Sequence, residues 1–204
     1  MDAPSLQGRH VRLVPLSAAH AAPLFEVARD AQLFRYMPVR IADLAAMQAY
    51  IAQAQAEQAA GRTIPFAIEL SDGSLVGSTR FCAIEPAHAR AEIGWTWLSA
   101  RVQRTAVNTE CKRLLLEYAF DTLKLNRIEL KTDSRNQVSR AAIARLGATE
   151  EGRFRRHMVL PDGYVRDTVW FSILREEWPT VRERLDRFLA HNHSSRTAAT
   201  ATAD

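Results

Sequence analysis

The segment Arg101–Glu110 has the residue types and spacing best suited to holding an anionic ligand. It reads RVQRTAVNTE, has no bulky apolar side chain except two valines, and leads into the most regular helical pattern of the chain. The first turn of a helix presents unpaired backbone N–H groups and the positive end of the helix dipole. Such a turn, preceded by small and polar residues, can wrap a pyrophosphate. The alternative is an ordinary helix start after a polar loop.

Two neighbouring stretches strengthen the first interpretation. Upstream, Ala91–Leu98 (AEIGWTWL) is a strand pattern with an acid and a glycine in its middle. Downstream, Asp133–Ser139 (DSRNQVS) precedes a helix that ends in Arg-Leu-Gly-Ala, followed by Glu151-Gly152. These stretches, in this order and at these separations, resemble the GNAT acetyltransferases, and most closely the bacterial-type RimJ/RimL branch, which includes enzymes that acetylate ribosomal-protein N-termini. The resemblance runs from about Leu6 to Phe188.

The resemblance implies acetyl-CoA as the co-substrate and assigns residues to it. In the family a motif Q/R-x-x-G-x-G/A opens the central helix and binds the CoA pyrophosphate through backbone amides. Arg104 stands where glycine is usual, which implies either a negative φ at this position or a guanidinium that joins the phosphate site. The cofactor-binding residues expected from this motif and from the loop after the next strand are Arg101, Arg104, Thr105, Ala106, Val107, Asn108, Thr109 and Asn136.

Two residues beyond that loop have competing interpretations. The resemblance places Asn136 at a position that contacts the cofactor, but an Asn here also predicts an N-cap, and both roles can hold together. Ser139, one helical turn on, matches a hydroxyl that points at the acetyl-CoA sulfur in some relatives. Its alternative is a helix surface residue.

Glu92 is the first candidate for the general base. Acetyl transfer requires a group that takes up the amine proton, and a carboxylate suffices for an α-amine with a pKa near 8. Glu92 lies in the middle of a strand upstream of the expected phosphate loop, in a region that would line the cleft. The alternative is an exposed strand carboxylate. Backbone N–H groups of this strand would, by resemblance, polarise the thioester carbonyl.

The elements that would position these residues alternate along the chain. The expected strands are Leu6–Leu16, Pro65–Leu70, Leu75–Ile84, Ala89–Leu98, Arg127–Thr132, Thr149–Val159 and Tyr164–Leu174. The expected helices are one capped by Ser17, Ile41–Ala60, Ala106–Leu123, Gln137–Leu146 and one that carries Trp178 and Phe188. The fold class is α/β (α+β). By resemblance it is a GNAT-like mixed, mostly antiparallel sheet of about seven strands with helices on both faces, in one domain over residues 1–190. Residues 191–204 have almost no large apolar side chain, which predicts a disordered tail.

Composition narrows the class of protein. With 47% hydrophobic and 25% charged residues, the sequence is typical of a soluble globular protein. The absence of a long apolar run or a leader predicts no membrane span and a cytoplasmic protein. A net charge of +4 makes nucleic-acid binding a weak candidate. Cys82 and Cys111 have no neighbours at metal-ligand spacing, which predicts buried thiols and no metal.

Other features leave the acceptor open. Arg153–Arg156 and His157 could meet an acidic substrate, a phosphate or RNA, but a solvated strand edge is the plainer interpretation. For at least one of Trp95 and Trp97, core packing is favoured over substrate stacking. The acceptor could be a protein N-terminus, or a small amine such as a polyamine, amino acid or aminoglycoside. A non-catalytic acyl-CoA-binding module with the same fold is the second hypothesis, and pairing through the C-terminal strands into a homodimer is an expectation from resemblance.

Overall fold

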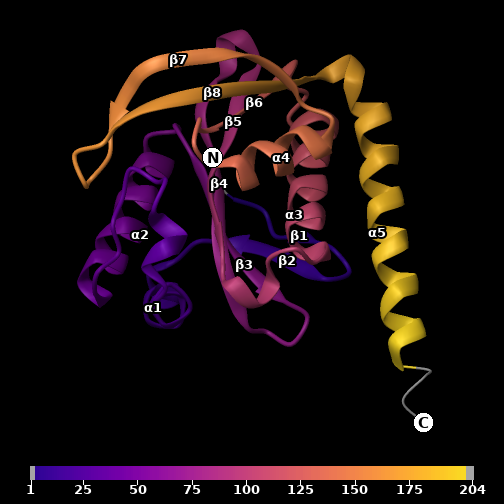
Figure 1. The fold of residues 1–204 in the computed structure, drawn as a ribbon, viewed down its shortest axis with the longest axis horizontal. Helices are drawn as coiled ribbons and strands as arrows, with labels where there is room; N and C mark the ends of the chain where they lie inside the picture. Colours follow the sequence, from indigo (N-terminus) through magenta and orange to yellow (C-terminus); the bar gives the residue numbers. More distant parts are fainter. Residues whose placement is uncertain (1–2, 201–204) are drawn as a thin grey trace.

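One eight-stranded sheet organises the chain (Figure 1). The computed structural model describes residues 3–200, and the side chains of residues 3–191. The strands are β1 (Leu6–Gln7), β2 (Val11–Pro15), β3 (Ile64–Leu70), β4 (Leu75–Glu85), β5 (Arg90–Leu98), β6 (Arg127–Asp133), β7 (Thr149–Val159) and β8 (Val165–Leu174). Their order across the sheet is β1-β2-β3-β4-β5-β6-β8-β7.

Within residues 3–200, five α-helices cover the two faces of this sheet (Figure 1). They are α1 (Ala21–Val27), α2 (Leu44–Ala59), α3 (Ala106–Glu117), α4 (Gln137–Leu146) and α5 (Trp178–Thr200). Helices α1 and α2 lie on one face, and α3, α4 and α5 on the other. The larger apolar core lies under α3 and α5, where Leu115, Ile128 and Phe171 are buried, and the smaller one lies under α1 and α2, around Leu24 and Met47.

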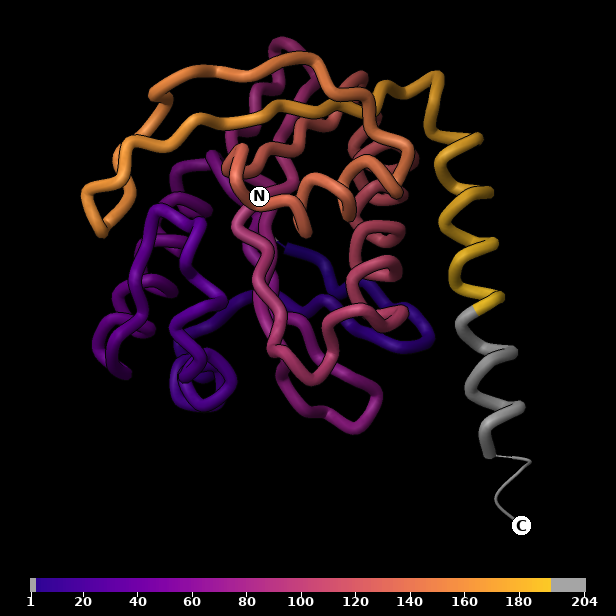
Figure 2. Tube along the Cα trace, in the orientation of Figure 1, coloured from indigo at the N-terminus to yellow at the C-terminus, as the bar shows by residue number. Residues whose placement is uncertain are grey.

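Most neighbouring strands are antiparallel, and β5 and β6 are the exception. They pair in parallel from Arg90–Glu92 to Arg127–Glu129, and β5 then continues to Leu98 while β6 goes on alongside β8. The chain trace in Figure 2 shows β5 and β6 separating beyond this short ladder. The expected mixed, mostly antiparallel sheet with helices on both faces is therefore confirmed.

The N-terminal strand expected over Leu6–Leu16 is wrong in detail, because the segment folds into the hairpin β1–β2 and raises the strand number to eight. A tertiary contact holds this turn. The buried Glu110 carboxylate of α3 accepts the backbone N–H groups of Arg9, His10 and Val11 at 2.9, 2.6 and 2.8 Å. A Cβ at Gly8 would lie 2.6 Å from that carboxylate, so the turn requires glycine there.

Helix boundaries follow local chemistry. Helix α2 begins at Leu44 and not at Ile41, because the Asp43 side chain accepts the Ala46 N–H as an N-cap. Helix α3 ends at Glu117, and the last five residues expected with it before Leu123 form one π-helical turn. The span expected for Gln137–Leu146 is confirmed. The tail expected from residue 191 on lies, except for His191, outside the residues whose side chains are described, and stays a prediction.

Candidate active site

The point where β5 leaves β6 is the structural centre of the candidate site. A bulge in β5 opposes β4 there, between the pairs Arg80↔Gly94 and Ser78↔Trp97. Trp95 lies within this bulge and has a φ of +54°, a left-handed conformation that is uncommon for an aromatic residue. The bulge ends the regular ladder and lets the two parallel strands separate. Bulges of this kind occur next to active sites.

Glu92 lies immediately before this bulge and is only 3% exposed, so the alternative of an exposed strand carboxylate is wrong. Its Oε2 atom lies 2.7 Å from the Nζ atom of Lys131 on β6. A Cβ at Gly94 would meet the Glu92 Oε1 atom at 2.5 Å, so this glycine gives the carboxylate its space. The Lys131 ammonium also lies 4.8 Å from the centre of a ring of Trp170 on β8. Three neighbouring strands thus build one polar cluster on the face that carries α1 and α2.

The expected phosphate loop begins helix α3 as the sequence predicted. Thr105 is the N-cap, and its Oγ1 atom accepts the Val107 N–H at 3.3 Å. Arg104 has φ of +59°, so the alternative of a negative φ at this position is wrong. An arginine here holds the backbone shape that favours glycine, and its side chain is exposed to solvent.

The other residues predicted in this loop contribute in different ways. The side chains of Ala106, Val107 and Thr109 are buried, so they can meet a ligand only through their backbone. The Thr109 hydroxyl accepts a hydrogen bond from Arg145 at 2.9 Å. Arg101 donates to the Ser74 hydroxyl at 3.0 Å, on the turn between β3 and β4.

Asn136 is the N-cap of α4, and its Oδ1 atom accepts the Ser139 N–H at 3.0 Å. The capping interpretation of Asn136 is therefore confirmed, and its cofactor contact stays a prediction. Ser139 is half-buried in the first turn of α4. Because β5 and β6 run in the same direction, the segments that follow them, the start of α3 and the Asn136 turn, lie toward the same end of the two strands. The fold therefore supports the grouping of these residues.

Lys112 is a candidate residue that sequence reasoning missed. Its side chain is buried in α3, and its Nζ atom donates to the Thr96 hydroxyl of the β5 bulge at 2.7 Å. Burial lowers the pKa of Lys112 from 10.5 to about 8, against the opposing influence of Cys111, Cys82 and Glu92. No local pattern separates this residue from a solvated helix lysine. Only the packing of α3 against the bulge reveals it.

The two cysteines are buried and free, as predicted. Burial raises the pKa of Cys111 to about 12 and raises that of Cys82 further still. Both thiols therefore stay protonated at neutral pH, which disfavours a nucleophilic role.

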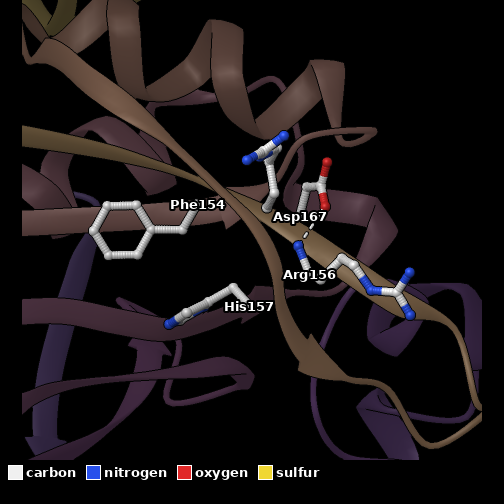
Figure 3. A pocket seen from close by; sticks show the side chains of 5 residues that line it. Phe154, Arg156, His157 and Asp167 are labelled. Atoms are coloured by element: carbon white, nitrogen blue, oxygen red, sulfur yellow. Dashed lines mark hydrogen bonds between the residues drawn. The ribbon is translucent and has the colours of Figure 1, made fainter.

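The β7–β8 hairpin forms a hollow of about 790 Å³, lined by Phe154, Arg155, Arg156, His157 and Asp167 (Figure 3). The rings of Phe154 and His157 project to one side of the strand and the Arg156 side chain to the other. Both rings lie within 6 Å of Trp170, centre to centre, which connects the hollow to the Glu92–Lys131 pair. Burial, followed by Lys131 and Arg166, lowers the pKa of His157.

The solvated-edge interpretation of the basic run is confirmed, because residues 153–157 are all exposed and β7 is the last strand of the sheet. Arg153 forms an ion pair with Asp167 on an exposed edge, whereas Phe154 and His157 turn toward Trp170. Trp97 is buried against Phe34 at 5.4 Å, so the core interpretation is confirmed for Trp97.

Within the described part of the chain, no three His, Cys, Asp or Glu side chains are grouped closely enough to hold a metal ion. No helix among these residues is both long and apolar enough to cross a bilayer.

Comparisons with known proteins agree with this geometry. The family model described as "Acetyltransferase (GNAT) domain" matches residues 10–149, more than half of the chain. A structure of a GCN5-related N-acetyltransferase from Brucella melitensis superposes with a TM-score of 0.86 at 31% identity, over 93% of this chain and 86% of that one. Mycobacterium smegmatis RimJ, solved in complex with CoA-disulfide, superposes with a TM-score of 0.76 at 28% identity, over 90% and 92% of the two chains.

A curated relative from Bacillus subtilis is named "Putative ribosomal N-acetyltransferase YdaF". It is 35% identical over 109 residues, 53% of this chain and 58% of its own length. The chain thus spans little more than half of that relative. The family match and the fold together show that the chain belongs to the GNAT acetyltransferase family, in its RimJ/RimL-like part.

Proposed function

We propose that the protein transfers an acetyl group from acetyl-CoA to a primary amine, and that the acceptor is the α-amine of a protein or peptide. The observation that carries this proposal is the buried Glu92 carboxylate at the point where β5 and β6 separate. A buried carboxylate beside a strand bulge, on the face opposite α3, has the chemistry needed to receive a proton from an incoming amine.

The chain has features that fit a CoA diphosphate. Arg104, in a left-handed conformation, directly precedes Thr105, the N-cap of α3. The first backbone N–H groups of α3 point out of the N-terminal end of the helix. These groups and the helix dipole favour an anion, and the exposed Arg104 guanidinium adds a cation beside them. When bound, acetyl-CoA supplies the thioester and its acetyl group.

In the proposed reaction the protein orients the amine and manages one proton. The amine nitrogen forms a bond to the thioester carbon, and the carbon–sulfur bond breaks so that CoA leaves as its thiolate. One amine proton passes to Glu92 directly or through one water. Lys131 holds the Glu92 carboxylate in place through the 2.7 Å ion pair. The backbone N–H groups of the β5 bulge polarise the carbonyl oxygen. The Ser139 hydroxyl lies at the proposed sulfur side.

An α-amine suits this arrangement better than a lysine side chain. Its pKa near 8 leaves an appreciable neutral fraction at pH 7, whereas a lysine ε-amine near 10.4 has almost none. The word "ribosomal" in the name of the B. subtilis relative supports a protein N-terminus as the acceptor class.

An acetyl-transfer screen tests the proposal. Peptides with varied N-termini, polyamines and aminoglycosides are each incubated with acetyl-CoA, and acetylated products are identified by mass spectrometry. We expect transfer to peptide α-amines. Transfer only to polyamines or aminoglycosides would overturn the acceptor class.

Calorimetric titration with CoA, combined with this screen, distinguishes the proposed acetyltransferase from a non-catalytic module. CoA binding without transfer to any amine would support the non-catalytic acyl-CoA-binding module. No detectable binding at millimolar CoA would overturn both hypotheses.

A further inference from the structure

Arg166 of β8 is a buried cation without a carboxylate of its own. It is 5% exposed, and its Nη1 atom donates to the backbone carbonyl of Tyr36 at 3.0 Å. Its Nε atom has no hydrogen-bond partner. No ion pair within 4 Å is recorded for this guanidinium among the described residues. A charge removed from water without a partner is strongly unfavourable, so such a group indicates that another molecule supplies the partner.

Asp133, the acid with the largest electrostatic influence on Arg166, is already paired with another arginine. Asp133 is fully buried, and both of its oxygens accept hydrogen bonds from the Arg135 guanidinium, at 3.1 and 2.7 Å. Its Oδ1 atom also accepts the Arg135 backbone N–H at 2.8 Å. Arg135 lies 3.3 Å from the centre of the Tyr164 ring, which fixes it against the hairpin. Asp133 is therefore paired with Arg135, and it acts on Arg166 only through electrostatic attraction.

The second carboxylate that influences Arg166 is also paired with another cation. Glu92 is paired with Lys131, as Asp133 is with Arg135, so neither of these carboxylates forms an ion pair with Arg166. Burial lowers the pKa of Arg166, against the influence of Asp133 and Glu92, as expected for an undercompensated guanidinium.

Arg166 lies on the proposed acceptor side. Residues 166, 168 and 170 of β8 share one face of the sheet, because side chains alternate along a strand. Trp170 pairs with Lys131 in register, and Lys131 holds Glu92. Trp170 and Arg166 are four residue steps apart along β8, a span of roughly 13 Å. An extended peptide covers about 3.3–3.6 Å per residue, so about four residues of an acceptor that lies along β8 span the distance between Trp170 and Arg166.

The outer rim carries the same sign of charge. Arg155 and Arg156 line the hollow of the β7–β8 hairpin, and no ion pair within 4 Å is recorded for either guanidinium in the described part of the chain. Asp167, the acid that lines this hollow, is bound by Arg153 and by the Arg156 backbone N–H. Figure 3 shows the Arg156 side chain on the opposite side of the strand from the Phe154 and His157 rings. A peptide that leaves the site along this hairpin meets unpaired cations.

We propose that the acceptor carries a carboxylate close to its amine, and that Arg166 binds this carboxylate. The inference rests on the proposed function and narrows its substrate class to acidic N-termini, with a Glu or Asp among the first four residues. Arg166 is then the specificity residue, and the arginines of the hairpin rim attract the same acidic segment.

Matched peptides test this inference. Peptides that carry one Glu at position 2, 3 or 4 are compared with the same peptides carrying Gln, and kcat/KM is measured for each. A charge-assisted hydrogen bond to a buried partner predicts a preference of about ten-fold or more for Glu at one of these positions. Serine and serinamide form a second pair, in which a preference for serine would identify a free amino acid as the source of the carboxylate.

Variants of Arg166 complete the test. We expect Arg166→Gln to bring the preference close to one while the Gln peptide keeps its kcat/KM within a few-fold. Arg166→Lys keeps the charge and loses the forked geometry, so an intermediate preference is expected, and it serves in place of Arg166→Gln should that variant fail to fold. Arg184→Gln, on the exposed side of α5 across the sheet, is the matched control and keeps the full preference.

The outcomes separate the two proposals. Equal rates on Glu and Gln partners with wild-type enzyme, on peptides and on the serine pair alike, would overturn the inference and leave the proposed function intact. An equal loss on both members of a pair in Arg166→Gln would assign Arg166 to structure alone and would also overturn it. No transfer to any amine by the wild-type enzyme would overturn the proposed function and the inference with it.

Discussion

The two faces of the central sheet differ in character: one buries apolar side chains and the other carries ion pairs, although the same strands contribute to both. On the α3 and α5 side, Ile128 and Leu130 of β6 are buried among apolar side chains. On the other side, Glu129 and Lys131 of the same strand form ion pairs. The apolar face gains stability from burial, whereas the polar face buries charges at a cost. The difference indicates that stability depends mainly on one face and chemistry on the other.

Replacing Glu92 tests the polar face most severely. We expect Glu92→Gln to lower kcat/KM by about 10²–10⁴, the usual scale for loss of a general base. CoA affinity should stay nearly constant, because the carboxylate serves the acceptor side. The deficit should shrink at high pH, where the amine arrives deprotonated. A pH-rate profile from about pH 6 to pH 10 is the measurement, and a uniform deficit would assign Glu92 to substrate binding or strand structure.

A pair of phenylalanine truncations compares the faces by stability. Phe171→Ala removes a ring that is 2% exposed on the apolar face and should cost about 3–5 kcal/mol of unfolding free energy. Phe154→Ala removes a ring that is 53% exposed at the hairpin hollow and should cost less than about 1 kcal/mol while raising the KM for the acceptor. Urea unfolding and steady-state kinetics measure both. Equal losses of stability would contradict the division between the faces.

Lys112 is a buried charge on helix α3, on the mainly apolar side of the sheet, and the free-energy cost of burying it depends on pH. Its pKa falls from 10.5 in the unfolded chain to about 8 in the folded protein, so the folded state binds fewer protons between these values. The unfolding free energy should therefore rise with pH across this window, by about 1–3 kcal/mol. Lys112→Met lacks this titration, so its stability advantage near pH 7 should shrink toward pH 10. A constant difference between the two proteins across this range would refute the buried ammonium.

Substitutions of Arg104 should have the smallest effects of this series. They distinguish the contribution of the guanidinium charge to CoA binding from the strain of the left-handed backbone. Arg104→Ala should weaken CoA binding by about ten-fold, because one charge-assisted phosphate contact is lost. Arg104→Gly loses the same cation but relaxes the left-handed φ of +59°, so it should stabilise the fold by several tenths of a kcal/mol. Calorimetric titration and thermal unfolding measure the two effects. If Arg104→Gly binds CoA as tightly as wild-type protein, the guanidinium has no role there.

The sequence determined the elements and the loop that begins α3. Alternation and helical periodicity gave every α-helix and all strands of the sheet, except that β1 and β2 were expected as one. Their turn depends on Glu110, a residue about a hundred positions away, and no local pattern carries that information. Residues 101–109 were recognisable because a polar loop before a helix is a local signal.

Only the tertiary structure decided which charges are buried and which are paired. Glu92 and Lys131 lie in strands separated by α3, and their ion pair exists because β5 and β6 lie side by side. Lys112 and Arg166 read as ordinary solvated cations in the sequence, since burial is a property of what packs around a side chain. Pairing and desolvation are set by contacts between distant segments, so the chemistry of these groups follows from the fold and not from their local sequence.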